Sequence, residues 1–301
     1  MRSAFNMKTT AVQESRLELG LAGDGNLRWA VVDLTEVVQE ARDRRDLGPV
    51  ATAALGRSMA GAALLLRLAT KAPSRLVLEV RGDGPILRVL AEADQEGNLR
   101  GLVGDGQVDV PHYDNMKLAV GRAVGKGFLR VLREFAGGGA YHSQVELVSG
   151  EIGDDVAHYL EQSEQARSAV LLGVLGKPSG VAAAGGMIVE VLPGAPDEVI
   201  DRLEGNISRI RGVSELLAEG GTPQVVDRVL AGLDREVREV TPMRYRCRCS
   251  RERLLQHLVL LTADDREYLR REDGTIDADC VFCGTHYLFT PEEIYSPPSR
   301  G

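Results

Sequence analysis

The segment that decides the fold is "RLVLEVRGDGPILRVLAEADQEGNLRGLV", residues 75–103. It contains three short β-rich runs, separated by Asp83-Gly84 and by Glu96-Gly97-Asn98. Glycine and asparagine accept the positive φ that tight turns require, so both breaks are typical of hairpins. The segment therefore predicts three short strands joined by tight turns.

Helical and strand patterns flank this segment on both sides. Residues 27–43 begin as a strand and pass into a helical pattern, and residues 51–69 are apolar nearly all round, which is typical of a buried helix. Downstream we expect a strand over 141–148, a helix over 154–169 that begins at an aspartate cap, and a last strand within 185–196. The fold class is therefore α+β, with a mixed α/β domain over residues 1–194.

The composition changes after residue 194. Residues 195–246 carry 18 charged side chains in 52 positions, and apolar residues recur among them at helical spacing. The stripe comprises Val199, Leu203, Ile207, Ile210, Val213 and Leu217. Glycines interrupt the pattern, and each costs up to about 1 kcal/mol inside a helix. The sequence predicts a metastable helical linker over 195–241; a stably packed second helical domain fits the same pattern.

All four cysteines of the 301-residue chain lie near its end, as Cys247-x-Cys249 and Cys280-x-x-Cys283. Thiolates suit the tetrahedral shell of zinc, and two cysteine pairs at this spacing are a specific signal for it. We therefore predict a small zinc-binding domain over 242–301 that holds one Zn²⁺ per chain. His286 is more typical of a surface or packing histidine than of a ligand. Oxidation of the sulfurs and zinc binding exclude one another, so the site is a candidate redox switch.

Two other functions remain open for this cysteine cluster. Arginines surround its first half, as Arg244, Arg246, Arg248, Arg251 and Arg253. They fit either charge compensation of a four-thiolate zinc site or a structural zinc ribbon that touches nucleic acid. A thiol–disulfide oxidoreductase that uses Cys280 and Cys283 is a weaker alternative, because no strand–CxxC–helix pattern surrounds them.

The charge balance and the motif search exclude several other classes. A net charge of −8 argues against general nucleic-acid binding, and we find no run long enough to span a bilayer and no signal peptide in residues 1–16. We expect a cytoplasmic protein without membrane partners. We identify no catalytic residue and expect no enzymatic activity. The stretch "GRAVGKG", residues 121–127, departs from a phosphate loop in spacing and lacks the final Ser/Thr.

One polar group inside the predicted helix at 154–169 resembles an active-site cluster. It consists of Tyr159, Ser163 and Glu164. A buried polar contact that positions the helix is the better interpretation, because no nucleophile or metal-ligand pattern accompanies it.

Several segments together resemble a known family. They are "CRCSRERLLQHL" at 247–258, "DCVFCGTHYLFTPEEI" at 279–294, "YHSQVELVSGEIGDDVAHYLEQSEQ" at 141–165 and "GGMIVEVLPGA" at 185–195. In these segments the chain resembles the redox-regulated heat-shock holdase chaperones, the 33-kilodalton heat-shock protein family. Length, domain order and cysteine spacing agree over most of the chain.

The resemblance implies a mechanism and a set of roles. Cys247, Cys249, Cys280 and Cys283 bind zinc in a reduced, inactive monomer of the bacterial cytoplasm. Oxidation forms the Cys247–Cys249 and Cys280–Cys283 disulfides, releases zinc, unfolds the terminal domain and destabilises the linker. The oxidised chain then dimerises and holds unfolding client proteins without ATP.

Overall fold

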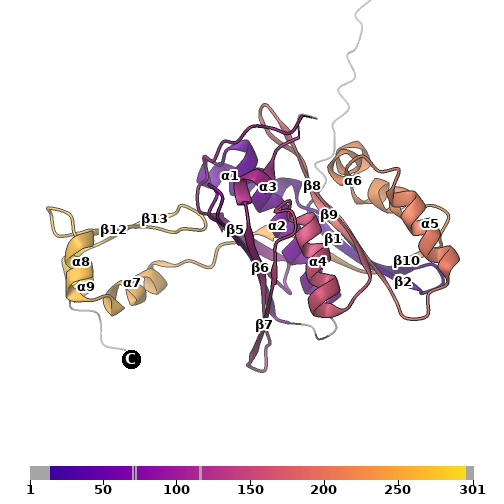
Figure 1. Ribbon diagram of the computed structural model, residues 1–301. Coiled ribbons are helices and arrows are strands. Elements are labelled where there is room, and N and C mark those ends of the chain that lie inside the picture. Colours follow the sequence, from indigo (N-terminus) through magenta and orange to yellow (C-terminus); the bar gives the residue numbers. More distant parts are fainter. Residues whose placement is uncertain (1–13, 70, 72, 115–116, 296–301) are drawn as a thin grey trace, which may run out of the picture.

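A computed structural model describes residues 14–69, 71, 73–114 and 117–295 (Figure 1). Two sheets, one antiparallel and one antiparallel except for a short parallel edge strand, make up most of the molecule together with the helices between and outside them. A small module with the last elements projects from one side. The α+β fold class is confirmed. Residues 1–13, on which the absence of a signal peptide was judged, lie outside the described part.

The predicted hairpins form the middle of one sheet, which we call the second sheet. Its spatial order is β11 (Arg244–Tyr245), β5 (Asn98–Val103), β4 (Arg88–Asp94), β3 (Arg75–Gly82), β6 (Gly127–Glu134) and β7 (Ala140–Glu146). The Glu96-Gly97-Asn98 turn is as expected, with Gly97 at φ 79°. The other turn is longer than expected: it runs from Asp83 to Leu87, and Leu87 rather than Gly84 has the positive φ, 64°.

The other sheet, the first sheet, contains three strands that we did not predict: β1, β8 and β10. Its order is β10 (Arg235–Pro242), β1 (Arg16–Ala22), β2 (Leu27–Asp33), β9 (Gly180–Val191) and β8 (Ser168–Lys177). The expected last strand, β9, is followed by β10, which returns to pair with β1. Residues assigned to the linker thus supply an edge strand of this sheet.

Helix α4 (Gly153–Glu164) differs from the predicted helix at both ends. It ends at Glu164 because Gln165 is left-handed, with φ 53°, and β8 begins soon afterwards. The N-cap is Ile152 rather than an aspartate. The fully buried Asp155 lies one turn inside the helix and accepts backbone N–H bonds from Val148 at 2.8 Å and Ile152 at 2.9 Å.

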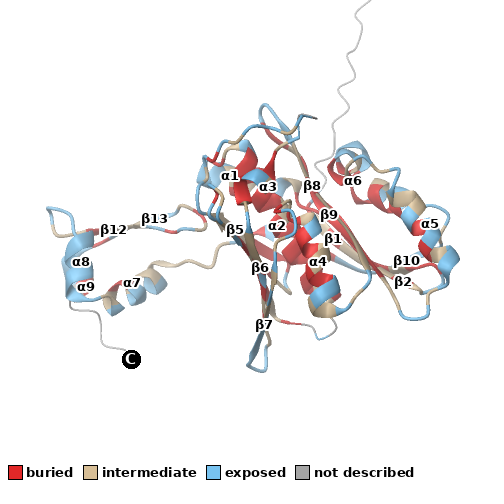
Figure 2. Ribbon diagram, in the orientation of Figure 1, coloured by how far each residue is buried: buried red, intermediate tan, exposed pale blue. Residues whose placement is uncertain are grey.

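The apolar helix predicted at 51–69 is α2 (Pro49–Leu68), which lies between the two sheets as the centre of the core (Figure 2). Proline at its first position suits a helix start. Its length and hydropathy alone would let it cross a membrane, but 89% of the tested window is buried within the fold. Helix α1 (Thr35–Arg45) packs beside it, and the short α3 (Val120–Val124) precedes β6.

The predicted apolar stripe of the linker lies against the outer face of the first sheet. It runs from α5 (Asp197–Ile207) through the connecting Ile210 into α6 (Val213–Val229). Helix α6 packs on β2, β8 and β9, and α5 packs against α6 and shares the same apolar cluster (Figure 1). Leu217 lies close to the backbone of Gly185: a Cβ on Gly185 would be 2.9 Å from Cδ1 of Leu217. Gly220 and Gly221 are not helical and bend α6 in its middle. The predicted domain boundaries at 194/195 and 241/242 stay predictions.

The projecting module has little apolar interior. It contains α7 (Arg251–Leu260), α8 (Ala263–Leu269), β12 (Ile276–Asp279), β13 (His286–Phe289) and α9 (Pro291–Tyr295). Its buried apolar residues are Leu258, Ile276, Phe289 and Ile294. The rest of its ribbon is mostly exposed or intermediate (Figure 2).

Candidate metal centre and its surroundings

The structure brings the four cysteines of the two motifs into one cluster. Their sulfur atoms all lie within 4.8 Å of one another, and the closest approaches join the motifs: Cys247 to Cys280 at 3.6 Å and Cys249 to Cys283 at 3.4 Å. A tetrahedral zinc site with Zn–S of 2.3 Å separates its sulfurs by about 3.8 Å. The donor set and its spacing therefore fit a four-thiolate zinc ion.

Local backbone structure presents these sulfurs to one point. The CxC motif follows β11 and ends at Ser250, whose hydroxyl caps α7 by accepting the N–H of Arg253. The CxxC motif forms a tight turn between β12 and β13. Its turn is closed by backbone bonds from Cys280 N to Thr285 O at 2.9 Å and from Gly284 N to Cys280 O at 2.8 Å.

The thiols differ in their environments. Burial raises the pKa of Cys247 to about 12 and also raises that of Cys249. Burial acts in the same direction on Cys283, but hydrogen bonds from Thr285, whose hydroxyl lies 3.1 Å from the sulfur, and from the other thiols lower its pKa to about 7. Metals bind thiolates, and the surroundings of Cys283 favour its thiolate more than those of Cys247 and Cys249 do.

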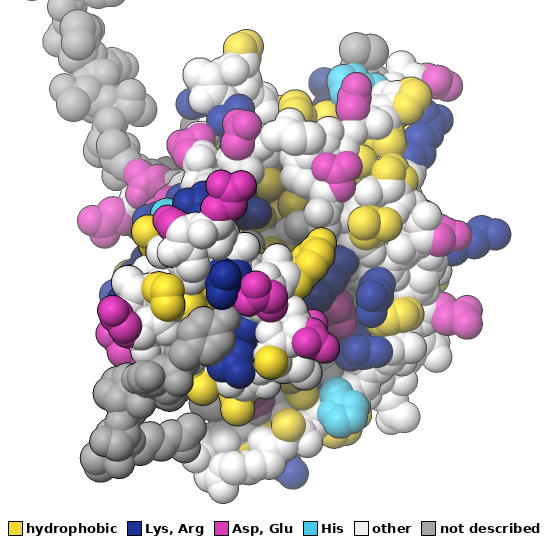
Figure 3. All heavy atoms as spheres, turned by 90° about the vertical axis from the view of Figure 1, so that its left-hand side faces the viewer, with side chains coloured by type: hydrophobic (Ala, Val, Ile, Leu, Met, Phe, Trp, Pro, Cys, Tyr) yellow, Lys and Arg dark blue, Asp and Glu magenta, His cyan; other side chains and the backbone are white. Residues whose placement is uncertain are grey.

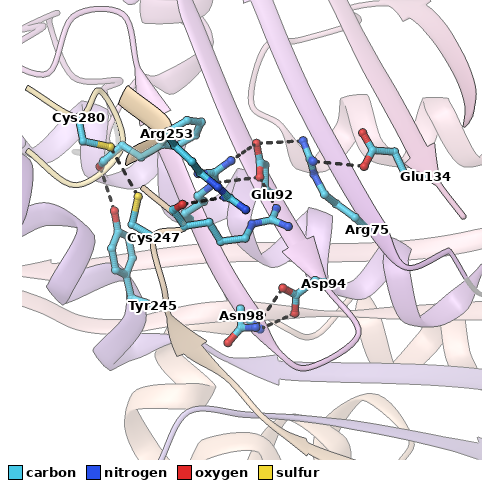
Figure 4. A network of polar contacts seen from close by, with 12 residues as sticks. Arg75, Glu92, Asp94, Asn98, Glu134, Tyr245, Cys247, Arg253 and Cys280 are labelled. Atoms are coloured by element: carbon cyan, nitrogen blue, oxygen red, sulfur yellow. Dashed lines mark hydrogen bonds and ion pairs between the residues drawn. The ribbon is translucent and has the colours of Figure 1, made fainter. Parts of the chain in front are cut away.

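The cysteine cluster is fastened to the second sheet by a group of charged and aromatic contacts (Figure 4). Glu92 of β4 is buried and accepts bonds from Arg100 at 2.8 Å and from Arg248, the residue between Cys247 and Cys249, at 2.9 Å. Arg100 also stacks on Phe282 of the CxxC turn, 3.9 Å from the ring centroid. The Tyr245 hydroxyl donates to Phe282 O at 2.9 Å. Both halves of the metal centre thus contact the sheet.

The chain is similar to known proteins in both sequence and structure over most of its length. The sequence model described as Hsp33 protein matches residues 15–290. A 33 kDa chaperonin of Thermus thermophilus is 47% identical, with 93% of this chain and 86% of that protein covered. One from Bacillus licheniformis is 40% identical, with 91% and 95% covered. The crystal structure of the 33 kDa chaperonin of Thermotoga maritima matches with a TM-score of 0.87 at 35% identity, covering 94% of this chain and 97% of that chain.

The chain belongs to the Hsp33 family.

Membership confirms the family resemblance seen in the sequence and supports a chaperone function. The four clustered cysteines of this Hsp33 chain have the arrangement to bind zinc or to form disulfides. The assignment of Cys247, Cys249, Cys280 and Cys283 as zinc ligands stays a prediction. Tyr245, Glu92, Arg100 and Phe282 were not singled out from the sequence, since their roles arise from contacts between distant segments.

The arginines around the CxC motif are largely engaged within the Hsp33 chain. Arg244 donates to Asn98, Arg248 to Glu92, and Arg251 to Glu293. Basic and acidic side chains are interspersed over the face that carries the module (Figure 3). This mixture favours charge compensation over a phosphate-binding surface.

His286, which we did not assign as a ligand, lies beside a different group. Its Nδ1 is 3.0 Å from Asp277 and 2.9 Å from Asp279, and its side chain is 56% exposed. Arg271 also pairs with Asp277. The group is thus a cluster of polar contacts at the β12–β13 hairpin, with one ion pair between Arg271 and Asp277.

The two motifs set aside in the sequence analysis have structural roles. The fully buried Tyr159 donates to Glu164 at 2.8 Å, and Glu164 pairs with Arg133 at 2.9 Å; Ser143, rather than the expected Ser163, lies 3.3 Å from the tyrosine hydroxyl. This contact ties α4 to β6 and β7. In the stretch at 121–127, the Lys126 N–H donates to the carboxylate of Asp83 at 2.7 Å, which places an anion of the chain itself against this loop.

Proposed function

We propose that this Hsp33 chain is a redox-regulated, ATP-independent holdase of the bacterial cytoplasm. In the reduced state it binds one Zn²⁺ through Cys247, Cys249, Cys280 and Cys283 and is inactive. Oxidation releases the zinc and activates the chain to bind unfolding client proteins under oxidative stress. The observation that carries the proposal is the convergence of the four sulfurs within 4.8 Å. We propose no catalytic residue.

The chemistry at the site balances with peroxide as the oxidant. Two thiolates give up two electrons to one H₂O₂, which takes up two protons and becomes two water molecules, and a disulfide forms. Two such steps use up all four thiolates, and Zn²⁺ leaves because disulfide sulfur is a poor ligand. Within the motifs the products are Cys247–Cys249 and Cys280–Cys283.

The closest sulfurs in the folded module belong to different motifs. Disulfides within each motif are therefore expected to form only after the module has unfolded. Once zinc leaves, 30 residues separate Cys249 from Cys280, whereas the cysteines of each motif stay two or three positions apart. Closing a short loop costs less entropy than closing a long one. Disulfides within each motif are therefore the expected products, and peptide mapping by mass spectrometry distinguishes them from bridges between the motifs.

The route from the metal centre to the linker runs along the chain. Helix α6 leads into β10, β10 into β11, and β11 directly into the CxC motif. We propose that unfolding of the module removes the support of this path, so that α5 and α6 leave the first sheet. The uncovered apolar residues then bind clients, and the oxidised chain forms a homodimer while the reduced chain is a monomer.

The deciding experiment follows zinc release and client aggregation in one sample after peroxide is added at raised temperature. We expect about one zinc per chain to leave as protection of a thermally unfolding citrate synthase appears. A Cys249→Ser variant should lose the link between the two signals, while Val281→Ser, an exposed non-ligand in the CxxC turn, should keep it. Zinc release without protection, or salt-dependent RNA binding by the reduced zinc form, would contradict the proposal.

A further inference from the structure

The edge of strand β5 is covered over only part of its length. Strand β11 pairs with it in parallel at Arg244↔Asn98 and Tyr245↔Leu99, while β5 continues to Val103. The N–H of Arg246 donates to Leu99 O at 2.8 Å, and there β11 ends. Backbone groups of a strand point to alternate sides, so Gly101 and Val103 face the same edge as Leu99, beyond the end of β11.

Two side-chain positions lie along this edge. The first is occupied by Tyr245, which is 9% exposed and packs beside Leu99 in the main core. The second is a cavity of about 170 Å³ at Gly101, lined by Leu47, Leu55 and Val103 among others. Extending the β11 register by two residues places a side chain opposite Gly101, on the same face as Tyr245. Arg45 and Gln107 also line this cavity, so the second position is only partly apolar. The edge therefore offers one apolar and one partly apolar position at the spacing of an extended chain.

The segment that covers this edge is held there by the metal centre. The Tyr245 hydroxyl donates to Phe282 O, between Cys280 and Cys283, at 2.9 Å (Figure 4). Gly284, which follows the CxxC motif, packs against the end of α1: a Cβ on it would lie 2.9 Å from Arg44 O. Unfolding of the CxxC turn removes both contacts. Strand β11 is then held by two residues of pairing, the Arg244–Asn98 hydrogen bond and the packing of Tyr245.

We propose that the edge of β5 from Leu99 to Val103 is a docking site for an extended segment of an unfolded client. The client segment adds to the second sheet as a strand in place of β11, with apolar side chains two residues apart in the position of Tyr245 and in the Gly101 cavity. In the reduced state β11 occupies the first of these positions and blocks the site. This inference rests on the proposed oxidation-activated holdase function and adds a second client-binding site to the apolar residues uncovered by α5 and α6.

Two observations favour an unfolded polypeptide as the occupant. The segment seated on the edge is itself an extended peptide, and its backbone donates through the N–H groups of Arg244 and Arg246. Main-chain hydrogen bonds of this kind do not depend on the sequence of the client. The two side-chain positions require only apolar residues at alternate positions of the client segment. Such a segment is abundant in unfolding proteins and absent from folded surfaces, where strands are already paired.

The test uses a substitution that acts only on the free edge. Val103→Pro removes the N–H that points away from β4, and proline is tolerated on an edge strand in that orientation. Val103→Ala shortens the same side chain but keeps the N–H. The probe is a fluorescein-labelled peptide that copies residues 241–248 with Cys247→Val, which places an apolar side chain opposite Gly101. A second peptide with Tyr245→Asp is its control.

For the oxidised protein we expect the Val103→Pro variant to bind the probe about fivefold to tenfold more weakly than Val103→Ala, the loss expected for one backbone hydrogen bond. The reduced protein should bind neither peptide. Zinc content and thermal unfolding of the reduced variants show whether both fold. Independently of any variant, a probe with a diazirine two residues after its tyrosine should label residues 47–55 or 99–106 of the wild-type chain.

The other outcomes separate this inference from the proposed function. If oxidised wild type protects the client but Val103→Pro binds the probe like Val103→Ala, or if the label falls on the face under α5 and α6, the docking site is wrong and the holdase function stands. A label that joins two copies of β5 makes the edge a dimer interface and also overturns the inference. If zinc leaves and no protection appears, the proposed function itself fails.

Discussion

The layer of α5 and α6 and the C-terminal module are both appended to the two-sheet body, yet they are held in different ways. The helical layer shares a cluster of fourteen buried apolar residues with the first sheet, including Trp29 and Leu217. The module encloses four buried apolar residues of its own. Its remaining attachment is the cysteine cluster and the polar contacts of Glu92, Arg100 and Tyr245.

This difference supports the proposal that a chemical trigger lies in the module. Apolar burial responds little to oxidants, whereas thiolates respond directly. With so small a core, we expect the module to depend on a bound metal for its fold. We expect the helical layer to be less stable than the sheets, because Gly220 and Gly221 interrupt α6.

Loss of the metal should therefore affect the two regions very unequally. For reduced Cys283→Ser we expect hydrogen exchange in residues 251–295 to approach that of an unfolded chain, because structural zinc contributes about 10–16 kcal/mol. Strands β2, β3 and β9 should keep their protection. Val281→Ser, in the same turn but 60% exposed and not a ligand, is the matched control. Unchanged protection of α7 would mean that the module folds without metal.

The sequence correctly predicted those elements whose signal lies within a short stretch of residues. The hairpins of residues 75–103, the all-apolar α2 and the CxC and CxxC motifs each carry their signal within a few residues, and each was found. Strand β1 alternates as R-L-E-L-G-L over residues 16–21, and we did not use this short pattern. Strand β8 is an edge strand of mostly half-buried residues and shows no clear alternation of apolar and polar positions. Strand β10 is nearly all exposed, and its pairing with β1 spans more than 200 residues of sequence.

The surroundings of the candidate metal centre could not be predicted for a related reason. The ligand spacing is a property of the sequence, but the partners of Arg248 and Phe282 are set by how the module docks on the second sheet. Glu92 and Arg100 are charged residues on the outer face of that sheet, where exposed positions are expected. They are covered because Arg248 and Phe282, which are distant in the sequence, pack against this face. A pattern of neighbouring residues cannot predict such a contact.

The helical layer can be weakened while the module is left intact. Leu217, 4% exposed, contacts β9, so we expect Leu217→Ala to destabilise α6 by about 2–4 kcal/mol through the lost apolar contacts and the cavity. Exchange should rise in residues 197–229 while one zinc per chain is retained. Glu219→Ala, on the exposed side of the same helix, should change neither signal. Client protection by reduced Leu217→Ala would show that release of the layer is sufficient for activity; full protection of α5 and α6 from exchange would show that Leu217 does not hold them.

The smallest change should come from the polar contact that fastens the module to the second sheet. Glu92→Gln removes the charge that Arg100 and Arg248 share, which we expect to weaken docking by about 1–3 kcal/mol. Glu134→Gln is the control, because it contacts Arg75 but not Arg248. Exchange of residues 97–100 and 244–249 measures the effect.

The same carboxylate gives this contact a defined pH dependence. Burial acts to raise the pKa of Glu92, but the hydrogen bond and charge of Arg100, with Arg75 and Arg248, outweigh it and the pKa is lowered. A lowered folded pKa means that the stabilisation is complete above the ordinary glutamate value, about 4.3, and is lost as the pH falls through the folded pKa. Wild type and Glu92→Gln should thus differ at neutral pH and converge only in acid. Convergence near neutral pH would mean that the carboxylate is not held ionised by these arginines, and that Phe282 stacking and the Tyr245 hydrogen bond fasten the module instead.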